Sequence, residues 1–426
     1  MLDIRSIAQD KEVVIQKLKK RQVKNAVSSV EKALALNQRR KKLQGTSDQL
    51  RHEMKQKSIA IAAVLKTGDT PAAEALKREV MAVKTKYKTM FADLKATQAA
   101  LVASLLDIPN LPDDDVPLGK GEQDNPVRSL WDPEGRVETL EDSLKPHWNL
   151  LAQHGLASFE QGVKIVGAGF PVYMGKGAKL QRALINFFLD EAAKAGYAER
   201  WLPIVANEAS VTATGQLPDK AGQMYEIPNL GYLISTGEIP LTNICRDAML
   251  GSADLPQRFC AYTACFRREA GSWGRNVRGL NRLHQFDKVE IVQVVTPEDT
   301  EATFHSMCTH VRTLLEKLGL TYRIVAICTG DLGFTAAKTY DFEVYAPGQQ
   351  RWLEASSVSS FNDYQARRLN LRCPAPGGGK RFCHTLNGSA LALPRILAAL
   401  LETYQTPSGI AIPTVLHPYT TFTSID

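Results

Sequence analysis

The stretch CFRREAGSWGRNVRGLNRLHQFDKVEIV at residues 265–292 gathers the side chains best suited to chemistry. It contains five arginines and one lysine, it is interrupted by three glycines, and it ends in an alternating run typical of a β-strand. Arginine binds phosphate and carboxylate groups through paired hydrogen bonds. This much positive charge in a strand–loop–strand segment therefore indicates an anion-binding site.

Alternation along the two strands predicts which of these side chains lie together. Arg267 and Glu269 share one face of the first strand, because successive side chains point to opposite faces. The return strand places a second set on one face: His284, Phe286, Lys288 and Glu290. Hairpin closure can bring a guanidinium, carboxylates and a flat ring onto a common surface: Arg267, Glu269, His284, Phe286 and Glu290. Such a set suits a nucleotide and a small charged molecule, with arginine on phosphate and the ring on the base.

Composition limits the class of protein that must position this segment. The chain has 426 residues, of which 44% are apolar and 23% charged, which excludes a disordered chain. It contains no apolar run of the roughly 18–20 residues that span a bilayer, and its N-terminus is too charged for a signal peptide. The seven cysteines are odd in number and form no CxxC pair, which argues against a disulfide framework or a zinc site. We expect an intracellular, cytoplasmic protein without a membrane segment.

The first third of the chain predicts two long helices over about residues 26–106. The second helix carries apolar residues at alternating spacings of three and four, the pattern of a coiled-coil seam, with a polar position near Thr97. These residues are Leu76, Val80, Val83, Tyr87, Met90, Leu94, Leu101 and Leu105. Between the helices, KTGDTP (66–71) predicts a turn in which Thr70 caps the second helix and Pro71 lies in its first turn. The simplest arrangement is an antiparallel helical hairpin.

Charge is unevenly distributed between this hairpin and the rest of the chain. Residues 1–110 contain 22 Lys and Arg against 11 Asp and Glu, a balance of +11, whereas the remainder has 30 against 34, a balance of −4. A basic arm that binds a polyanion explains this excess, and so does a solvated, lysine-rich helical surface. The Pro-, Gly- and Asp-rich segment 108–126 is expected to be a linker.

The remaining residues predict an α+β domain, a mainly antiparallel sheet flanked by helices, because strands rarely alternate with single helices here. Residues 176–197 form an amphipathic helix pattern, residues 201–207 favour a strand, and residues 388–405 favour a closing helix. Alternating segments that favour strands are 232–243, 284–295, 322–330 and 339–359, the last as two strands.

Phe266-Arg267-x-Glu269, a loop and then His284-x-Phe286 resembles motif 2 of class II aminoacyl-tRNA synthetases. The stretch FRREAGSWGRNVRGLNRLHQFDKVE is more similar still to seryl-tRNA synthetases, whose usual form is FRSEAG…RGLxRxHQFxKVE. Further blocks resemble that family in order: IPNLPDDDVPLG (108–119), RALINFFLD (182–190) followed by Pro203, TGQLP (214–218), STGEIPLTN (235–243), EASS (354–357), NDYQARR (362–368) and HTLNGSALALPRILAALLE (384–402). The resemblance covers essentially the whole chain.

This resemblance implies an α+β chain of two domains: an N-terminal tRNA-binding domain at 1–107 with the coiled-coil hairpin, and a class II catalytic domain at 108–426. It implies ATP-dependent activation of L-serine and transfer of serine to tRNA(Ser), and also to tRNA(Sec) where that tRNA exists. It further implies Mg²⁺, and a homodimer formed through the helix at 176–197 and the following strand.

The resemblance also implies roles for individual residues. Arg267 and Arg395 are expected to be catalytic, with Arg395 on the γ-phosphate. Serine is expected to bind Thr236, Gly237, Glu238, Arg267, Glu290 and Ser389. ATP is expected to bind Arg267, Arg268, Glu269, Leu283, Phe286, Glu354, Ala355, Ser356, Ser357 and Arg395. Magnesium is expected between Glu354 and Ser357.

Several alternatives remain open at this point. Pro394 replaces the glycine usual in this family, which is tolerated in the first turn of a helix but kinks it if deeper. The loop residues Arg275, Arg278 and Arg282 either contact ATP or the tRNA end or form a solvated face. A related ligase that loads a carrier protein, and a degenerate RNA-binding homologue, are the rival functions; the basic arm argues against the first and the retained site residues against the second.

Overall fold

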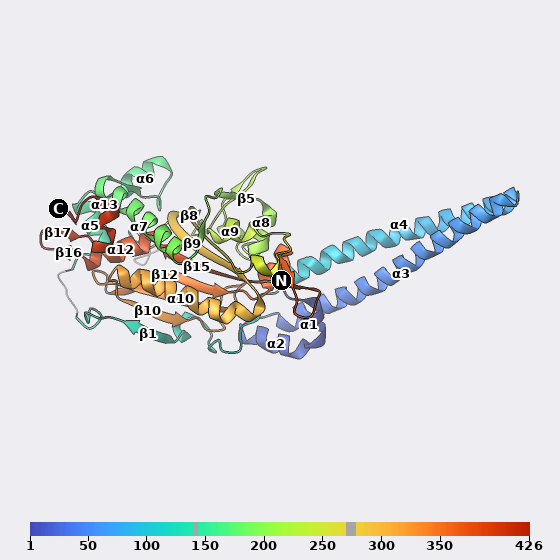
Figure 1. Ribbon diagram of the computed structural model, residues 1–426, viewed down its shortest axis with the longest axis horizontal. Coiled ribbons are helices and arrows are strands. Elements are labelled where there is room, and N and C mark those ends of the chain that lie inside the picture. Colours follow the sequence, from blue (N-terminus) through green and yellow to red (C-terminus); the bar gives the residue numbers. More distant parts are fainter. Residues whose placement is uncertain (140–143, 270–277) are drawn as a thin grey trace. The chain divides into compact units, whose positions relative to one another are not determined.

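The computed structural model describes residues 1–139, 144–269 and 278–426 (Figure 1). These residues form two compact units, Met1–Lys19 with Val23–Pro109, and Lys20–Gln22 with Asn110–Asp426. Arg275, from the predicted basic loop, lies outside the described residues. Within them, no helix is both long and apolar enough to cross a membrane.

The first unit is a helical hairpin with two short helices before it. Its helices are α1 (Ile4–Gln9), α2 (Lys11–Lys20), α3 (Ala26–Lys66) and α4 (Thr70–Leu106). The two long helices α3 and α4 run side by side (Figure 1). Apolar residues of the predicted seam, among them Val83, Leu94 and Leu101, are buried between them, and so is Thr97, its predicted polar position. The coiled-coil prediction is therefore confirmed.

The turn between α3 and α4 corrects one detail of the prediction. Asp69, not Thr70, caps α4, because its carboxylate accepts a hydrogen bond from the Ala72 N–H at 3.0 Å. Thr70 is the first helical residue, and Pro71 lies in the first turn as expected.

The second unit is built on a sheet of eight described strands, antiparallel except for its last pair. In spatial order the strands are β1 (Val127–Trp131), β10 (Tyr322–Ala326), β11 (Lys338–Ala346), β12 (Arg351–Ser360), β15 (His384–Ala392), β9 (Gln285–Val295), β8 (Gln257–Phe266) and β4 (Ala198–Glu199). The helices of this unit are α5 (His147–Gln153), α6 (Phe159–Ile165), α7 (Gly175–Lys194), α8 (Glu208–Thr214), α9 (Glu238–Asn243), α10 (Thr300–Lys317), α11 (Tyr364–Leu369), α12 (Leu393–Thr403) and α13 (His417–Thr420). The predicted α+β class is confirmed.

Small sheets complete the second unit. They pair β2 (Ala157–Ser158) with β3 (Val172–Tyr173), β5 (Val205–Ala206) and β6 (Glu226–Ile227) with β7 (Gly231–Leu233), β13 (Arg372–Pro374) with β14 (Lys380–Phe382), and β16 (Gln405–Thr406) and β18 (Ser424–Ile425) with β17 (Gly409–Ala411).

Helices cover both faces of the large sheet, and strand β9 shows the division clearly. Val289 and Ile291 join the larger apolar core, to which α7, α10 and α12 contribute. Val292 and Val294 point the other way, into a smaller core shared with α8, α9 and α11. Because faces alternate along a strand, Glu290 lies on this second face.

Three segments differ from the sequence-based expectation. Residues 232–243 form the end of β7 and then helix α9, whose Pro240 lies in the first turn, where no backbone N–H is needed. Residues 388–392 are strand rather than helix, because they continue the pairing of β15 with β9, while Gly388 also pairs with Val358 of β12. Within 201–207, only Val205–Ala206 is a strand.

Candidate active site

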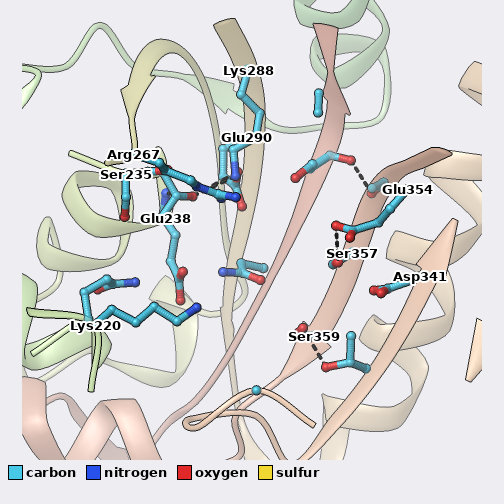
Figure 2. Close-up of a pocket in the computed structure, with 18 of the residues that line it drawn as sticks. Lys220, Ser235, Glu238, Arg267, Lys288, Glu290, Asp341, Glu354, Ser357 and Ser359 are labelled. Carbon is cyan, nitrogen blue, oxygen red and sulfur yellow. Dashed lines mark hydrogen bonds and ion pairs between the residues drawn. The ribbon is translucent and has the colours of Figure 1, made fainter. Parts of the chain in front are cut away.

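A cavity of about 520 Å³ opens on the face of the large sheet that carries Lys288 and Glu290. Its walls come from α8 and α9, the segment that follows β8, the first half of β9, the middle of β11 and β12, and the junction of β15 with α12. This volume lies in the range of small-molecule sites. Figure 2 shows two groups of side chains facing each other across the cavity: Glu238, Arg267, Lys288 and Glu290 on one side, and Asp341, Glu354 and Ser357 on the other.

Arg267 follows the last residue of β8 and is held from two sides. Its Nε donates to the Ser235 carbonyl oxygen at 3.4 Å, and its guanidinium carbon lies 5.1 Å from the centre of the Phe286 ring. The backbone N–H of Arg267 donates to the His284 carbonyl oxygen at 2.8 Å, which closes the hairpin. The predicted guanidinium and ring are therefore adjacent in the cavity wall.

Arg395 is a further cation in the cavity lining. Its Nη1 donates to the Glu354 carbonyl oxygen at 2.6 Å and lies 3.5 Å from the Glu354 carboxylate, while its Nε donates to the Asn281 carbonyl oxygen at 3.3 Å. Pro394 is the second residue of α12, in the first turn, so it does not kink the helix.

Lys288, Glu290 and Thr236 form a buried triangle. The Lys288 ammonium pairs with the Glu290 carboxylate and donates to Thr236 Oγ1 at 2.7 Å. The Thr236 hydroxyl in turn donates to Glu290 Oε2 at 3.4 Å. Burial raises the pKa of Glu290, and the positive charge of Lys288 opposes that rise.

Glu238 is the second buried carboxyl on this side. Its Oε1 accepts a hydrogen bond from Gln365 Nε2 at 2.6 Å. Burial, followed by repulsion from Glu290, raises the pKa of Glu238 to about 7. Two buried carboxyls, of which only Glu290 is paired with Lys288, make this end of the cavity suited to a small cation such as an ammonium group.

The opposite wall presents oxygen atoms. The Ser357 hydroxyl donates to Glu354 Oε1 at 3.4 Å, and Asp341 lies opposite Ser357 in the register of β11 with β12. Asp341 Oδ1 is buried and has no hydrogen-bond partner among the described residues. Burial and the nearby Glu354 raise the pKa of Asp341 well above its ordinary value. No cluster of three or more His, Cys, Asp or Glu side chains in the described ranges is arranged as a metal site on its own.

Most of the residues predicted for the site line this cavity. They are Thr236, Glu238, Arg267, Glu269, Leu283, Phe286, Glu290, Glu354, Ala355, Ser356, Ser357, Ser389 and Arg395.

Three predicted residues lie elsewhere. Gly237 is not part of the cavity lining, but a Cβ atom there would lie 2.9 Å from the Glu290 Cβ, so the glycine leaves room for that carboxylate. Arg268 is also outside the lining, and its backbone N–H donates to the Gln223 carbonyl oxygen at 3.0 Å. His284, predicted on the common surface, instead stacks on Phe170 with ring centres 5.4 Å apart and bonds the Tyr225 hydroxyl.

The loop arginines that the structure describes have separate contacts. Arg282 pairs with Glu269 in the cavity wall, whereas the Arg278 guanidinium lies over the Trp148 ring at 4.8 Å. Cys265 is fully buried and its pKa is raised by that burial, which fits the expectation of packing rather than nucleophilic chemistry.

The sequence did not single out Lys288, Asp341 and Gln365 as site residues. Lys288 had a usable signal, since it lies two residues before Glu290 on the same strand face. Asp341 and Gln365 had none, because their positions depend on how β11 pairs with β12 and how α11 packs.

Comparisons with known proteins agree with this architecture. Residues 226–404 match the family model described as tRNA synthetase class II core domain (G, H, P, S and T), and residues 1–112 match the seryl-tRNA synthetase N-terminal domain. The chain is 42% identical to a serine–tRNA ligase of Salinibacter ruber, covering 100% of this chain and 99% of that protein. It is 45% identical to one of Akkermansia muciniphila, covering 98% and 97%. Its fold matches the crystal structure of seryl-tRNA synthetase from Pyrococcus horikoshii complexed with ATP, with a TM-score of 0.91, 31% identity, and 100% and 99% of the two chains covered.

The antiparallel sheet, the arginines of the cavity and the matched core domain define a class II aminoacyl-tRNA synthetase. Within that class, the matched N-terminal domain and the full-length relatives both indicate one amino acid, serine. The chain belongs to the seryl-tRNA synthetase family.

Proposed function

We propose that this chain activates L-serine with ATP and then transfers the serine to the 3′ end of tRNA(Ser). In the first step the serine carboxylate attacks the α-phosphorus of ATP, the bond from that phosphorus to pyrophosphate breaks, and seryl-adenylate forms. In the second step a terminal ribose hydroxyl of the tRNA attacks the carbonyl carbon of the adenylate, the bond from that carbon to the AMP oxygen breaks, and AMP and the hydroxyl proton leave. One observation carries the proposal: a single cavity joins three arginines, Arg267, Arg282 and Arg395, to buried carboxyls with neighbouring hydroxyls.

The first step needs position and charge rather than an acid–base pair, because no proton has to move. Arg267 bridges the α-phosphate and the serine carboxylate, and Arg395 holds the γ-phosphate. Phe286 stacks on adenine, while Glu269, Leu283, Ala355 and Ser356 line the nucleotide. Arg268 acts at the edge of the nucleotide, since it is not part of the cavity lining.

Selection of serine over alanine follows from polar groups that the serine hydroxyl satisfies. Glu290 lies opposite Ser389 in the pairing of β9 with β15, so a serine hydroxyl between them meets an acceptor and a hydroxyl. Alanine would leave these groups unpaired, which costs about 1–3 kcal/mol for each buried group. Thr236 and Glu238 bind the remaining polar atoms of serine, and Gly237 keeps the space open for Glu290.

The oxygen-rich wall fits Mg²⁺. Glu354 and Ser357 would hold the ion, and the unpaired buried oxygen of Asp341 is a further donor on the same wall. Magnesium usually takes one or two carboxylates and completes its shell with substrate phosphates and water. When bound, it would supply positive charge between the phosphates of ATP.

The N-terminal unit serves as the tRNA-binding domain, with the α3–α4 hairpin as the arm that contacts tRNA(Ser). Its support is the excess of +11 charges over residues 1–110 and the exposure of basic residues on both helices, among them Lys41, Lys42, Lys84 and Lys88. Such an arm binds backbone and shape more than base sequence. Transfer to tRNA(Sec) belongs to this proposal where that tRNA exists.

We also assign a homodimer, formed through α7 and the short strand β4 that follows it, and a cytoplasmic location. All seven cysteines are free and buried, as is usual in a reducing compartment.

The decisive experiment is serine-dependent exchange of pyrophosphate into ATP, followed by charging of total tRNA. Exchange with serine and charging of serine-accepting tRNA are the expected results. Exchange with glycine or alanine but not serine would overturn the serine assignment. Exchange without any tRNA charging would favour a ligase that loads another carrier.

A further inference from the structure

A network of buried and half-buried hydrogen bonds adjoins the cavity through Leu280 and Asn281, outside the set of residues assigned to substrates. His147 at the start of α5 and Glu402 near the end of α12 are both 0% exposed, and the His147 Nδ1 lies 2.8 Å from Glu402 Oε1. The same carboxylate oxygen accepts from the His147 backbone N–H at 2.8 Å and from Gln349 Nε2 at 2.7 Å. Helices α5 and α12 are in contact (Figure 1).

The donors and acceptors in this network have one consistent assignment. His147 Nε2 accepts a hydrogen bond from the Leu280 backbone N–H at 2.9 Å, so it carries no proton. The proton of the imidazole is therefore on Nδ1, facing Glu402, and the ring is neutral. Gln349 must turn its NH₂ group toward the carboxylate, which leaves its Oε1 to accept from Asn281 Nδ2 at 2.7 Å.

These bonds fix two residues that line the cavity. Leu280 and Asn281 follow directly on the glycine Gly279, and the Asn281 carbonyl oxygen accepts from Arg395 Nε at 3.3 Å. Arg395 and Glu402 lie on the same helix, α12. The network therefore connects that helix to the segment Leu280–Asn281 at two points: at Arg395 near the helix start and, through His147 and Gln349, at Glu402 two turns later.

The backbone is adapted to this contact. Gly279 has a φ of +67°, and a Cβ atom there would lie 2.3 Å from His147 Nε2. Only glycine allows the chain to approach the imidazole this closely.

We propose that His147, Glu402 and Gln349 are positioning residues, which hold Leu280–Asn281 so that the Asn281 carbonyl oxygen orients the Arg395 guanidinium toward the nucleotide. The proposal rests on the assignment of Arg395 to ATP. It predicts that removing the hydrogen-bond acceptor of the Leu280 N–H, which is His147 Nε2, lowers kcat/KM for ATP. The KM for serine, which binds on the far side of the cavity, should not depend on this acceptor.

The test compares two replacements of one histidine in the full-length enzyme. His147→Gln keeps an oxygen near the position of Nε2 and can still accept from the Leu280 N–H, whereas His147→Asn keeps polar atoms only near Nδ1. In serine-dependent exchange, we expect kcat/KM for ATP to fall roughly 10- to 100-fold in His147→Asn. The loss in His147→Gln should be smaller than this by a factor of at least about three. The KM for serine should not change in either variant.

Controls separate this role from packing. His310 is a half-buried histidine whose buried Nε2 has no hydrogen-bond partner among the described residues, so His310→Gln reports the cost of replacing such an imidazole with glutamine. The proposal would be overturned if His147→Gln and His147→Asn lost kcat/KM for ATP equally and the loss followed the decrease in their melting temperatures.

Should both histidine variants fail to fold, the half-buried Gln349 provides the deciding test. Gln349→Ala removes the support of Asn281, and we expect about a tenfold loss in kcat/KM for ATP; unchanged ATP kinetics would overturn the proposal. Absence of serine-dependent exchange in the wild type would instead refute the proposed function.

Discussion

Replacing Glu238 with glutamine should stabilise the protein at neutral and alkaline pH while weakening its use of serine. Burial and the neighbouring Glu290 raise the pKa of Glu238 from its ordinary value of 4.5 to about 7. Between these two pH values the unfolded chain has lost the proton and the folded chain retains it. Stability therefore falls as pH rises through this window, by about 3 kcal/mol for a separation of roughly 2.5 pH units.

Glutamine does not titrate, so the variant escapes this loss. Its amide oxygen can still accept from Gln365, which bonds Glu238 Oε1 at 2.6 Å in the native protein. The free energy of unfolding of the variant, minus that of the wild type, should rise from near zero at pH 4.5 to about 3 kcal/mol above pH 7. The KM for serine should rise about tenfold or more, because a hydrogen bond to a charged group is lost.

The measurement is urea-induced unfolding of both proteins from pH 4.5 to 8.5 without substrates, together with serine-dependent exchange at pH 8. Glu226→Gln is the matched control, since Glu226 is exposed on β6 and its replacement should give a flat difference. A difference for Glu238→Gln that does not change between pH 5 and 8 would refute the argument that Glu238 is held protonated.

Three further predictions follow from the site and the arm. Lys288→Met leaves Glu290 buried without its cation and should destabilise the protein by roughly 3–5 kcal/mol in urea unfolding at pH 7.5; an unchanged midpoint would contradict the buried ion pair. Arg267→Ala should lower serine-dependent exchange at least about a thousandfold, and near-normal exchange would mean that another group holds the α-phosphate. Removal of residues 28–105 should leave adenylate formation intact and abolish tRNA charging; persistent charging would show that the hairpin is not the tRNA-binding element.

Sequence reasoning worked where local periodicity and residue type decide the structure. The seam of α4, including its polar position at Thr97, could be read from spacing alone, because a helix must bury a stripe of fixed period. The adjacency of Arg267 and Phe286 followed from a hairpin within one short segment.

Prediction failed where pairing between distant segments decides. Residues 388–392 continue into an apolar helix and look helical, yet they become strand because β9 offers a hydrogen-bonding edge along them and Gly388 also pairs with β12. The approach of Asp341 to Ser357 depends on a strand register that one sequence does not reveal. The cap at the start of α4 failed for a local reason, since Asp69 and Thr70 are both good capping residues and only the backbone angles choose between them.

The position of β15 has a consequence for synthesis of the chain. It is the last strand of the large sheet to be made, yet it lies between β12 and β9, at the centre of that sheet. Until residues 384–392 leave the ribosome, β8–β9 and β10–β12 are two separate half-sheets, each with an open edge. Open edges pair with other chains, so a product truncated before residue 384 should aggregate rather than accumulate as a folded fragment. Serine activation thus becomes possible only near the end of translation, when the central strand joins the two halves.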